Sequence, residues 1–102
     1  MYNIDYDEKV IRSFRCKKTE RLWQREPVKE FAAIASVALR RLTALDSAKV
    51  VTDLLIPPGN RLEPLSGDRR GQFSIRINDQ YRVCFAWVEE AAYDVEITKH
   101  YR

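Results

Sequence analysis

The fold of this chain is decided by residues 72–88, which read QFSIRINDQYRVCFAWV. Apolar and polar residues alternate up to residue 77, and the alternation resumes at residue 81. A period of two predicts two β-strands, each with one buried face. If both apolar sets face the same core, Ile77 lies opposite Tyr81, so that residues 78–80 form a three-residue turn.

This register places Arg76 directly across from Arg82, and two arginines that face each other repel unless an anion lies between or beside them. The polar face of the hairpin carries Ser74, Arg76, Arg82 and Cys84, and nearby loops add Arg61, Arg69 and Arg70. Arginine suits phosphate binding because its planar donor fork is always charged. The alternative is that these arginines pair with Glu63, Asp68 and Glu96 on a solvated surface. Cys84 is expected to be inert packing rather than a nucleophile.

The segments around the hairpin predict an α+β domain. Val10–Phe14 is interpreted as a short strand, and Thr19 as the N-cap of a helix that ends near Arg25, before Pro27. Apolar residues at three- and four-residue spacing predict a longer helix over Val28–Asp46, and Ser47–Leu55 adds one or two turns. Tyr93–Thr98 is the last strand. We therefore expect two layers, with helices on one face of an antiparallel sheet and the other face partly open.

Size and composition restrict the class of protein. A chain of 102 residues with 45% hydrophobic content is typical of one domain, and its active site should be an open groove. No stretch approaches the ~20 apolar residues of a membrane helix, and no signal-peptide pattern is present, so a soluble cytoplasmic protein is expected. Two distant cysteines and one histidine make a metal site improbable. No nucleotide-binding or metalloprotease motif occurs, so no cofactor is expected.

Basic residues are concentrated near the start of the chain. Within residues 9–25, seven basic residues accompany one acid, Glu20. Such a cluster fits an anionic partner, either RNA or an acidic protein segment, although any one of these residues can equally belong to a solvated face. The C-terminal residues Lys99, His100, Tyr101 and Arg102 place a group that titrates near neutrality beside a phenol and two cations. The alternative for this tail is a frayed end without a role.

Four segments resemble the HigB-like toxins, the plasmid-maintenance killer family of the RelE/ParE superfamily. They are Ile11–Phe14, Pro57–Leu62, Leu65–Arg69 and Gly71–Arg76, and the hairpin from Ile77 to Trp87 continues the match. The resemblance covers residues 10–102. It implies a RelE-like fold, a HigA-like helix-turn-helix antitoxin that alone contacts operator DNA, and metal-independent cleavage of mRNA on the ribosome.

The resemblance also implies roles for individual residues. Arg82 matches the family's strand arginine that contacts the scissile phosphate, and Tyr101 matches its C-terminal tyrosine. Glu63 stands where some relatives have a histidine, and Ser66 where they have a lysine. The usual acid-Tyr-His ending is here His100-Tyr101-Arg102. We therefore expect Arg82, Tyr101, His100 and Glu63 to be catalytic, and Arg61, Arg69, Arg70, Arg76 and Arg102 to bind RNA phosphates.

Residues 1–9 precede the family's usual Met-Ile-Arg-Ser-Phe start, which aligns with residues 10–14. They are interpreted as an N-terminal extension, and residues 10–102 as the toxin domain. Two other functions remain open at this point, because a shared fold does not decide function. One is a ParE-like inhibitor of DNA gyrase. The other is a catalytically weak binding module that acts through its antitoxin.

Overall fold

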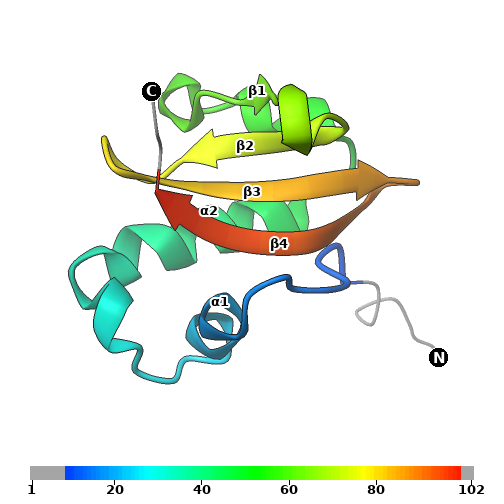
Figure 1. Cartoon of the computed structure of the whole chain (residues 1–102). Helices are drawn as coiled ribbons and strands as arrows, with labels where there is room; N and C mark the ends of the chain where they lie inside the picture. Colours follow the sequence, from blue (N-terminus) through cyan, green and yellow to red (C-terminus); the bar gives the residue numbers. More distant parts are fainter. Residues whose placement is uncertain (1–8, 100–102) are drawn as a thin grey trace, which may run out of the picture.

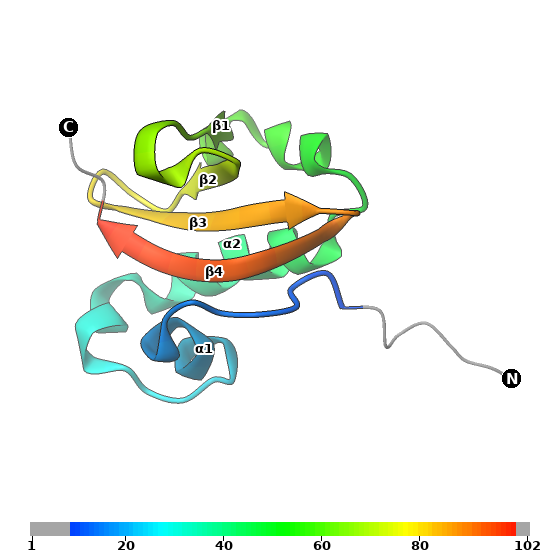
Figure 2. The ribbon, with the colours of Figure 1, turned by 45° about the vertical axis from the view of Figure 1, so that its right-hand side comes forward.

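Four antiparallel strands form one sheet in the computed structural model, which describes residues 9–99 (Figure 1). The strands lie in sequence order across the sheet: β1 (Glu63–Pro64), β2 (Gln72–Arg76), β3 (Tyr81–Val88) and β4 (Ala91–Lys99). Helix α2 (Ala35–Ser47) lies behind the sheet, and the shorter α1 (Lys17–Trp23) lies beside β4 (Figures 1 and 2). The predicted two-layer α+β fold is confirmed.

The hairpin has the register that the alternation predicts. Ile75 pairs with Val83 and Arg76 with Arg82, and the backbone N–H of Ile77 donates to the carbonyl of Tyr81 at 2.9 Å. The side chain of Asn78 accepts hydrogen bonds from two backbone N–H groups, those of Gln80 at the end of the turn and of Tyr81 just after it, at 2.8 Å each. The apolar face is buried against α2, so the opposite face of β2 and β3 is the one without α-helices.

Two predictions about the helices are wrong. The segment expected as one helix over residues 28–46 is a 3₁₀-helix, η2 (Lys29–Ile34), followed by α2. Thr19 is not an N-cap, because α1 begins two residues earlier, after Cys16, and Thr19 lies buried within it. The turns expected after residue 47 are present as the 3₁₀-helix η3 (Val51–Leu55), and η4 (Pro58–Asn60) and η5 (Gly67–Arg69) follow.

The N-terminal segment covers the outer edge of β4. Instead of a continuous strand over Val10–Phe14, it makes two isolated parallel bridges, Ile11 with Ala92 and Phe14 with Val95. Beyond them, the backbone N–H of Ile97 donates to the Thr19 hydroxyl at 3.0 Å. Thr19 therefore continues the pairing of the β4 edge with a side chain rather than with backbone.

One hydrophobic core joins these parts. It contains residues from Ile11 near the N-terminus to Ile97 in β4, and Leu42, Leu45, Ile75, Val83 and Phe85 are fully buried in it. The proposed extension, residues 1–9, lies outside the described residues except for Lys9. Within residues 9–99, no helix is both long and apolar enough to cross a membrane.

Candidate active site

A pocket of about 320 Å³ lies on the face of the sheet opposite α2. The η5 loop forms one side of it, and the end of β4 contributes Thr98 and Lys99. Sequence reasoning placed Arg82, Ser74 and Cys84 on this face, and all three line the pocket together with Glu63 and Arg69. The face expected to carry the chemistry is therefore hollowed, and most of the residues that line the hollow have polar or charged side chains.

Arg82 is held by two hydrogen bonds at the base of this pocket. Its Nε donates to the Ser74 hydroxyl at 2.7 Å, and its Nη2 donates to the carbonyl of Arg61 at 2.8 Å. The residue is only 6% exposed, whereas the sequence suggested an open groove position. Within residues 9–99, Nη1 makes no hydrogen bond, so two donors of the guanidinium fork are available to a ligand.

The loop that accepts the second hydrogen bond is fixed by Asn60, which is 1% exposed. Its side-chain amide donates to the carbonyls of Leu54 and Ile56 at 3.2 and 3.3 Å. The next residue, Arg61, adopts a left-handed conformation with φ of 48°, and its carbonyl points to Arg82. Sequence reasoning missed Asn60, because a single buried amide in a loop leaves no periodic signal.

Glu63 brings a carboxylate to the same guanidinium. Its Oε1 lies 3.7 Å from Arg82 Nη2, and its backbone pairs with Ser74 across β1 and β2. The Glu63 side chain is half exposed, so it can reach both Arg82 and a molecule bound in the pocket. A cation and a carboxylate that could act as a base therefore lie side by side.

Arg69 is already engaged in the structure. Its guanidinium donates to Gln72 Oε1 and to Glu96 Oε1, both at 3.0 Å, and Arg15 approaches Glu96 at 3.9 Å. Arginines thus pair with Glu63 and Glu96, which is the alternative that the sequence left open. Within residues 9–99, this pairing still leaves Nη1 of Arg82 without a partner. Arg69 shapes the pocket wall, and a phosphate that binds Arg69 would have to compete with its carboxylate partner.

The other predicted phosphate-binding arginines are dispersed. Arg76 lies opposite Arg82 as predicted, but its guanidinium pairs with Asp79 of the turn, which supplies the anion that such a pair needs. Arg61 and Arg70 are exposed on the loops that flank β1 and β2. Of the arginines expected to bind phosphate, Arg69 alone lines the pocket, and Arg102 lies outside the described residues with the expected catalytic pair His100 and Tyr101.

Cys84 is buried beside Arg82 and Arg69, and burial is the largest influence on its thiol. Burial raises the pKa of Cys84, and Glu96 adds to this effect, against a lowering by Arg69 and Arg82. A raised pKa keeps the thiol protonated near neutral pH, where only the thiolate is a strong nucleophile. Within residues 9–99, no three histidine, cysteine or acidic residues are grouped so as to hold a metal ion.

Comparisons with known proteins agree on one family. Residues 12–100 match the family described as RelE-like toxin of type II toxin-antitoxin system HigB. Toxin HigB-1 of Vibrio cholerae is 44% identical over 69 residues, which cover 68% of this chain and 73% of that protein.

Two solved structures are similar in fold. The YoeB-YefM complex from Staphylococcus aureus aligns with a TM-score of 0.58 and 14% identity, over 89% of this chain and 98% of the other. A mutant of YafQ from E. coli aligns with a TM-score of 0.56 and 13% identity, over 91% of this chain and 94% of the other. At these identities the likeness concerns the fold alone.

Proposed function

The chain belongs to the HigB-like family of toxins from type II toxin-antitoxin systems, and from this premise we propose that it is an endoribonuclease that cuts mRNA on the ribosome. The observation that carries the proposal is the position of Arg82. Arg82 lines a pocket, its Nη1 makes no hydrogen bond to any of residues 9–99, and the Glu63 carboxylate lies 3.7 Å from Nη2. Cleavage of a phosphodiester needs such a cation, which stabilises the negative charge that develops on the phosphoryl group in the transition state.

The proposed reaction is an attack by the ribose 2′-oxygen on the adjacent phosphorus. The new P–O2′ bond forms as the P–O5′ bond breaks, which leaves a 2′,3′-cyclic phosphate and a free 5′-hydroxyl. A base takes the 2′ proton, and an acid supplies a proton to the leaving 5′-oxygen. The proposal assigns no step to a metal ion.

We assign the charge-stabilising role to Arg82 and the titrating roles to Glu63 and His100. Tyr101 would position the nucleotide by stacking and could assist proton transfer. His100 and Tyr101 directly follow Lys99 in the sequence, and Lys99 lines the pocket, which supports this assignment. Arg61, Arg69, Arg70, Arg76 and Arg102 would contact phosphates along the RNA.

The partner in the cell is an antitoxin, and we propose that it is HigA-like and that it alone contacts operator DNA. We further propose that the toxin acts in the cytoplasm, where ribosomes and mRNA are found. Residues 10–102 would form the toxin domain, with residues 1–9 as an extension that the reaction does not use.

The test is a primer-extension assay on mRNA bound to programmed ribosomes, with naked mRNA and the Arg82→Ala variant as controls. We expect breaks within codons in the ribosomal A site, strongly reduced breaks with Arg82→Ala, and intact naked mRNA. Intact ribosome-bound mRNA together with inhibition of gyrase supercoiling would contradict the proposal and favour the ParE-like function. Intact mRNA and unaffected gyrase would favour a binding module without catalysis.

A further inference from the structure

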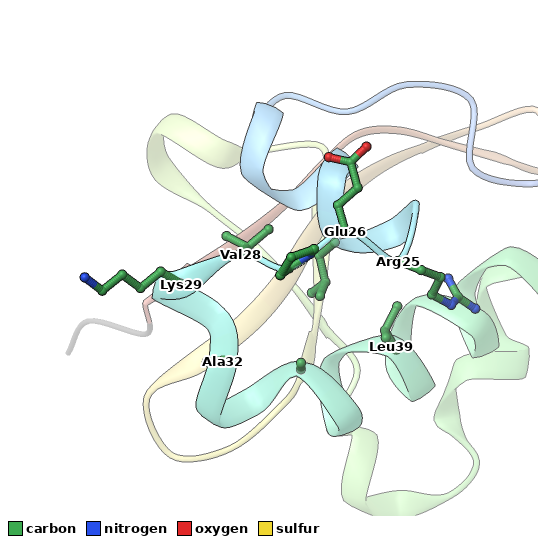
Figure 3. Close-up of a pocket in the computed structure, with 9 residues that line it drawn as sticks. Arg25, Glu26, Val28, Lys29, Ala32 and Leu39 are labelled. Carbon is green, nitrogen blue, oxygen red and sulfur yellow. The ribbon is translucent and has the colours of Figure 1, made fainter.

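A second hollow lies between the helices, away from the strand face that carries Arg82 (Figure 3). It has a volume of about 590 Å³ and is the larger of the two. We call it the helical groove. Its floor is aliphatic and is made by Leu22 of α1, Val28, Ala32 of η2, and Ala35 and Leu39 of α2.

The groove exists because small residues stand where the helices meet. Ala32 is exposed and Ala35 half-buried, and neither side chain is large enough to fill the space between α1 and α2. Leu22 and Val28 are 3% and 5% exposed and belong to the core, so the floor rests on well-packed side chains. A stable hollow with aliphatic walls is the kind of surface that a partner covers with its own apolar side chains.

Only some of the basic residues around the groove have an acidic partner. Residues 17–30 contain five basic residues and three acidic ones. Each acid has a basic partner within this segment: Lys17 with Glu20 at 4.0 Å, Lys18 with Glu30 at 2.7 Å, and Arg21 with Glu26 at 3.5 Å. The two remaining cations, Arg25 and Lys29, have no acidic partner within residues 9–99, and both line the groove.

Arg25 and Lys29 lie toward opposite sides of the hollow, with Val28 between them in the view of Figure 3. Arg25 also stacks over the Trp23 ring, with its guanidinium carbon 5.0 Å from the ring centroid, and its Nη1 donates to the Trp23 carbonyl. This arrangement presents an apolar centre with Arg25 and Lys29 at its sides, and the carboxylate of Glu26, which also lines the groove, is paired with Arg21. The complementary ligand has apolar side chains flanked by carboxylates.

We propose that the helical groove is a docking site for the antitoxin, and that it takes an antitoxin segment of apolar residues flanked by aspartate or glutamate. The chain belongs to a toxin-antitoxin family, so a protein partner exists that must bury apolar surface to bind stably. RNA is a poorer occupant because, among the described residues, none that lines the groove has an aromatic ring on which a base could stack. The inference rests on family membership and not on the proposed RNA cleavage.

The test compares two alanines that differ by one position. Ala32 lines the groove, whereas its neighbour Ala33 is also exposed but does not line it. Ala32→Glu places a carboxylate among apolar walls and beside the acidic ligand, and Ala33→Glu makes the same change in charge outside the groove. Binding of the purified full-length antitoxin to full-length toxin is measured by calorimetry, with thermal melts of each variant.

We expect Ala32→Glu to weaken binding by at least about thirtyfold, as for the loss of a central interface contact, and Ala33→Glu by less than about threefold. Lys29→Glu, which changes an exposed side chain, should weaken binding by about tenfold, and wild-type affinity should fall as salt rises. Equal affinities for Ala32→Glu and Ala33→Glu, with Lys29→Glu unchanged, would overturn the proposal.

Two further outcomes would assign the groove to another occupant. If sizing shows a wild-type dimer that Ala32→Glu converts to monomer while antitoxin binding persists, a second copy of the chain occupies the groove. If Ala32→Glu impairs ribosome binding and leaves antitoxin binding intact, the groove contacts the ribosome. Either result contradicts the docking proposal, and neither depends on whether the toxin cleaves RNA.

Discussion

Arg82 on β3 and Ser74 on β2 are diagonal neighbours on one face of the sheet, and the guanidinium Nε donates to the serine hydroxyl at 2.7 Å with both residues buried. The hydroxyl fixes one side of the guanidinium, and the Arg61 carbonyl fixes Nη2. Because both contacts are made before a ligand arrives, the guanidinium is held in place at the pocket with no further entropic cost. Arg82 is therefore a structural residue as well as a candidate catalytic one.

Replacement of Arg82 should change activity and stability together. We expect Arg82→Ala to lower single-turnover cleavage on ribosomes by roughly a hundred- to a thousandfold, about 2.7 to 4 kcal/mol, since a transition-state contact is lost. The variant should also unfold more easily by about 1–3 kcal/mol, because Ser74 and the Arg61 carbonyl lose a buried donor. Wild-type cleavage by folded Arg82→Ala would refute the assignment.

Removal of the serine hydroxyl tests how Arg82 is positioned. Ser74→Ala leaves the Arg82 Nε–H without its buried acceptor, so it should lower stability by about 1–3 kcal/mol. Cleavage should fall about tenfold, less than for Arg82→Ala, because the charge remains. Ser66→Ala, an exposed serine in the neighbouring loop, is the matched control. Chemical denaturation and single-turnover rates measured on both variants would show whether the hydroxyl matters.

Glu63 and His100 should partly replace each other in proton transfer. Glu63→Ala and His100→Ala are each expected to slow cleavage by about ten- to a hundredfold, and the double variant by more than either. Tyr101→Ala should act mainly by weakening nucleotide positioning. Glu63 is half exposed, so the melting temperature of Glu63→Ala should stay close to that of the wild type. If all of these variants cleave at the wild-type rate, the proton-transfer roles lie elsewhere.

Cys84 should make the protein less stable in alkali. Burial raises the folded-state pKa of Cys84 above the unfolded value of about 8.5. The resulting stabilisation is present below that unfolded pKa and is lost as pH rises through the folded pKa, since the unfolded chain then releases its proton more readily. Denaturant melts from about pH 7 to 10 should show that the free energy of unfolding falls less steeply with rising pH for Cys84→Ala than for the wild type.

Thr19 offers a test of the β4 edge. Thr19→Val keeps the shape of the side chain but removes the acceptor for the Ile97 N–H, and the site is fully buried. We expect a loss of about 1–3 kcal/mol in the free energy of unfolding, because a buried donor is left unpaired. Thr43→Val, at an exposed position of α2, is the control. Equal stability of the two variants would show that water replaces the hydroxyl.

The hairpin could be predicted from sequence because its signal is local and periodic. Alternation over residues 72–88 specified the two strands, the turn and the Arg76–Arg82 pair. The helical region was harder, since the spacing of three between Phe31 and Ile34 fits a 3₁₀-helix as well as an α-helix. β1 has two residues, too few for any alternation to appear. Thr19 resembled an N-cap because threonine favours that position, but a tertiary partner took its hydroxyl.

The candidate site was predictable in its residue types but not in its geometry. Arg82 and Ser74 could be assigned to one face, because alternate strand residues share a face and the register pairs the two strands. The burial of Arg82 could not be foreseen, since it depends on Asn60 and on the left-handed Arg61, both in a loop. The helical groove also left no signal, because it arises from small residues on elements brought together only by the fold.

The pairing along β4 has a consequence for how other proteins can attach. Backbone N–H groups of Ala92, Asp94, Val95 and Ile97 are all taken by the segment that runs beside this strand or by Thr19. At the opposite border of the sheet, β1 is two residues long and one of them, Pro64, has no N–H. Neither border offers a ladder on which a foreign strand could extend the sheet. Because both edges of the sheet are blocked in this way, the protein is protected against edge-to-edge aggregation, and other proteins have to bind it through contacts with its side chains.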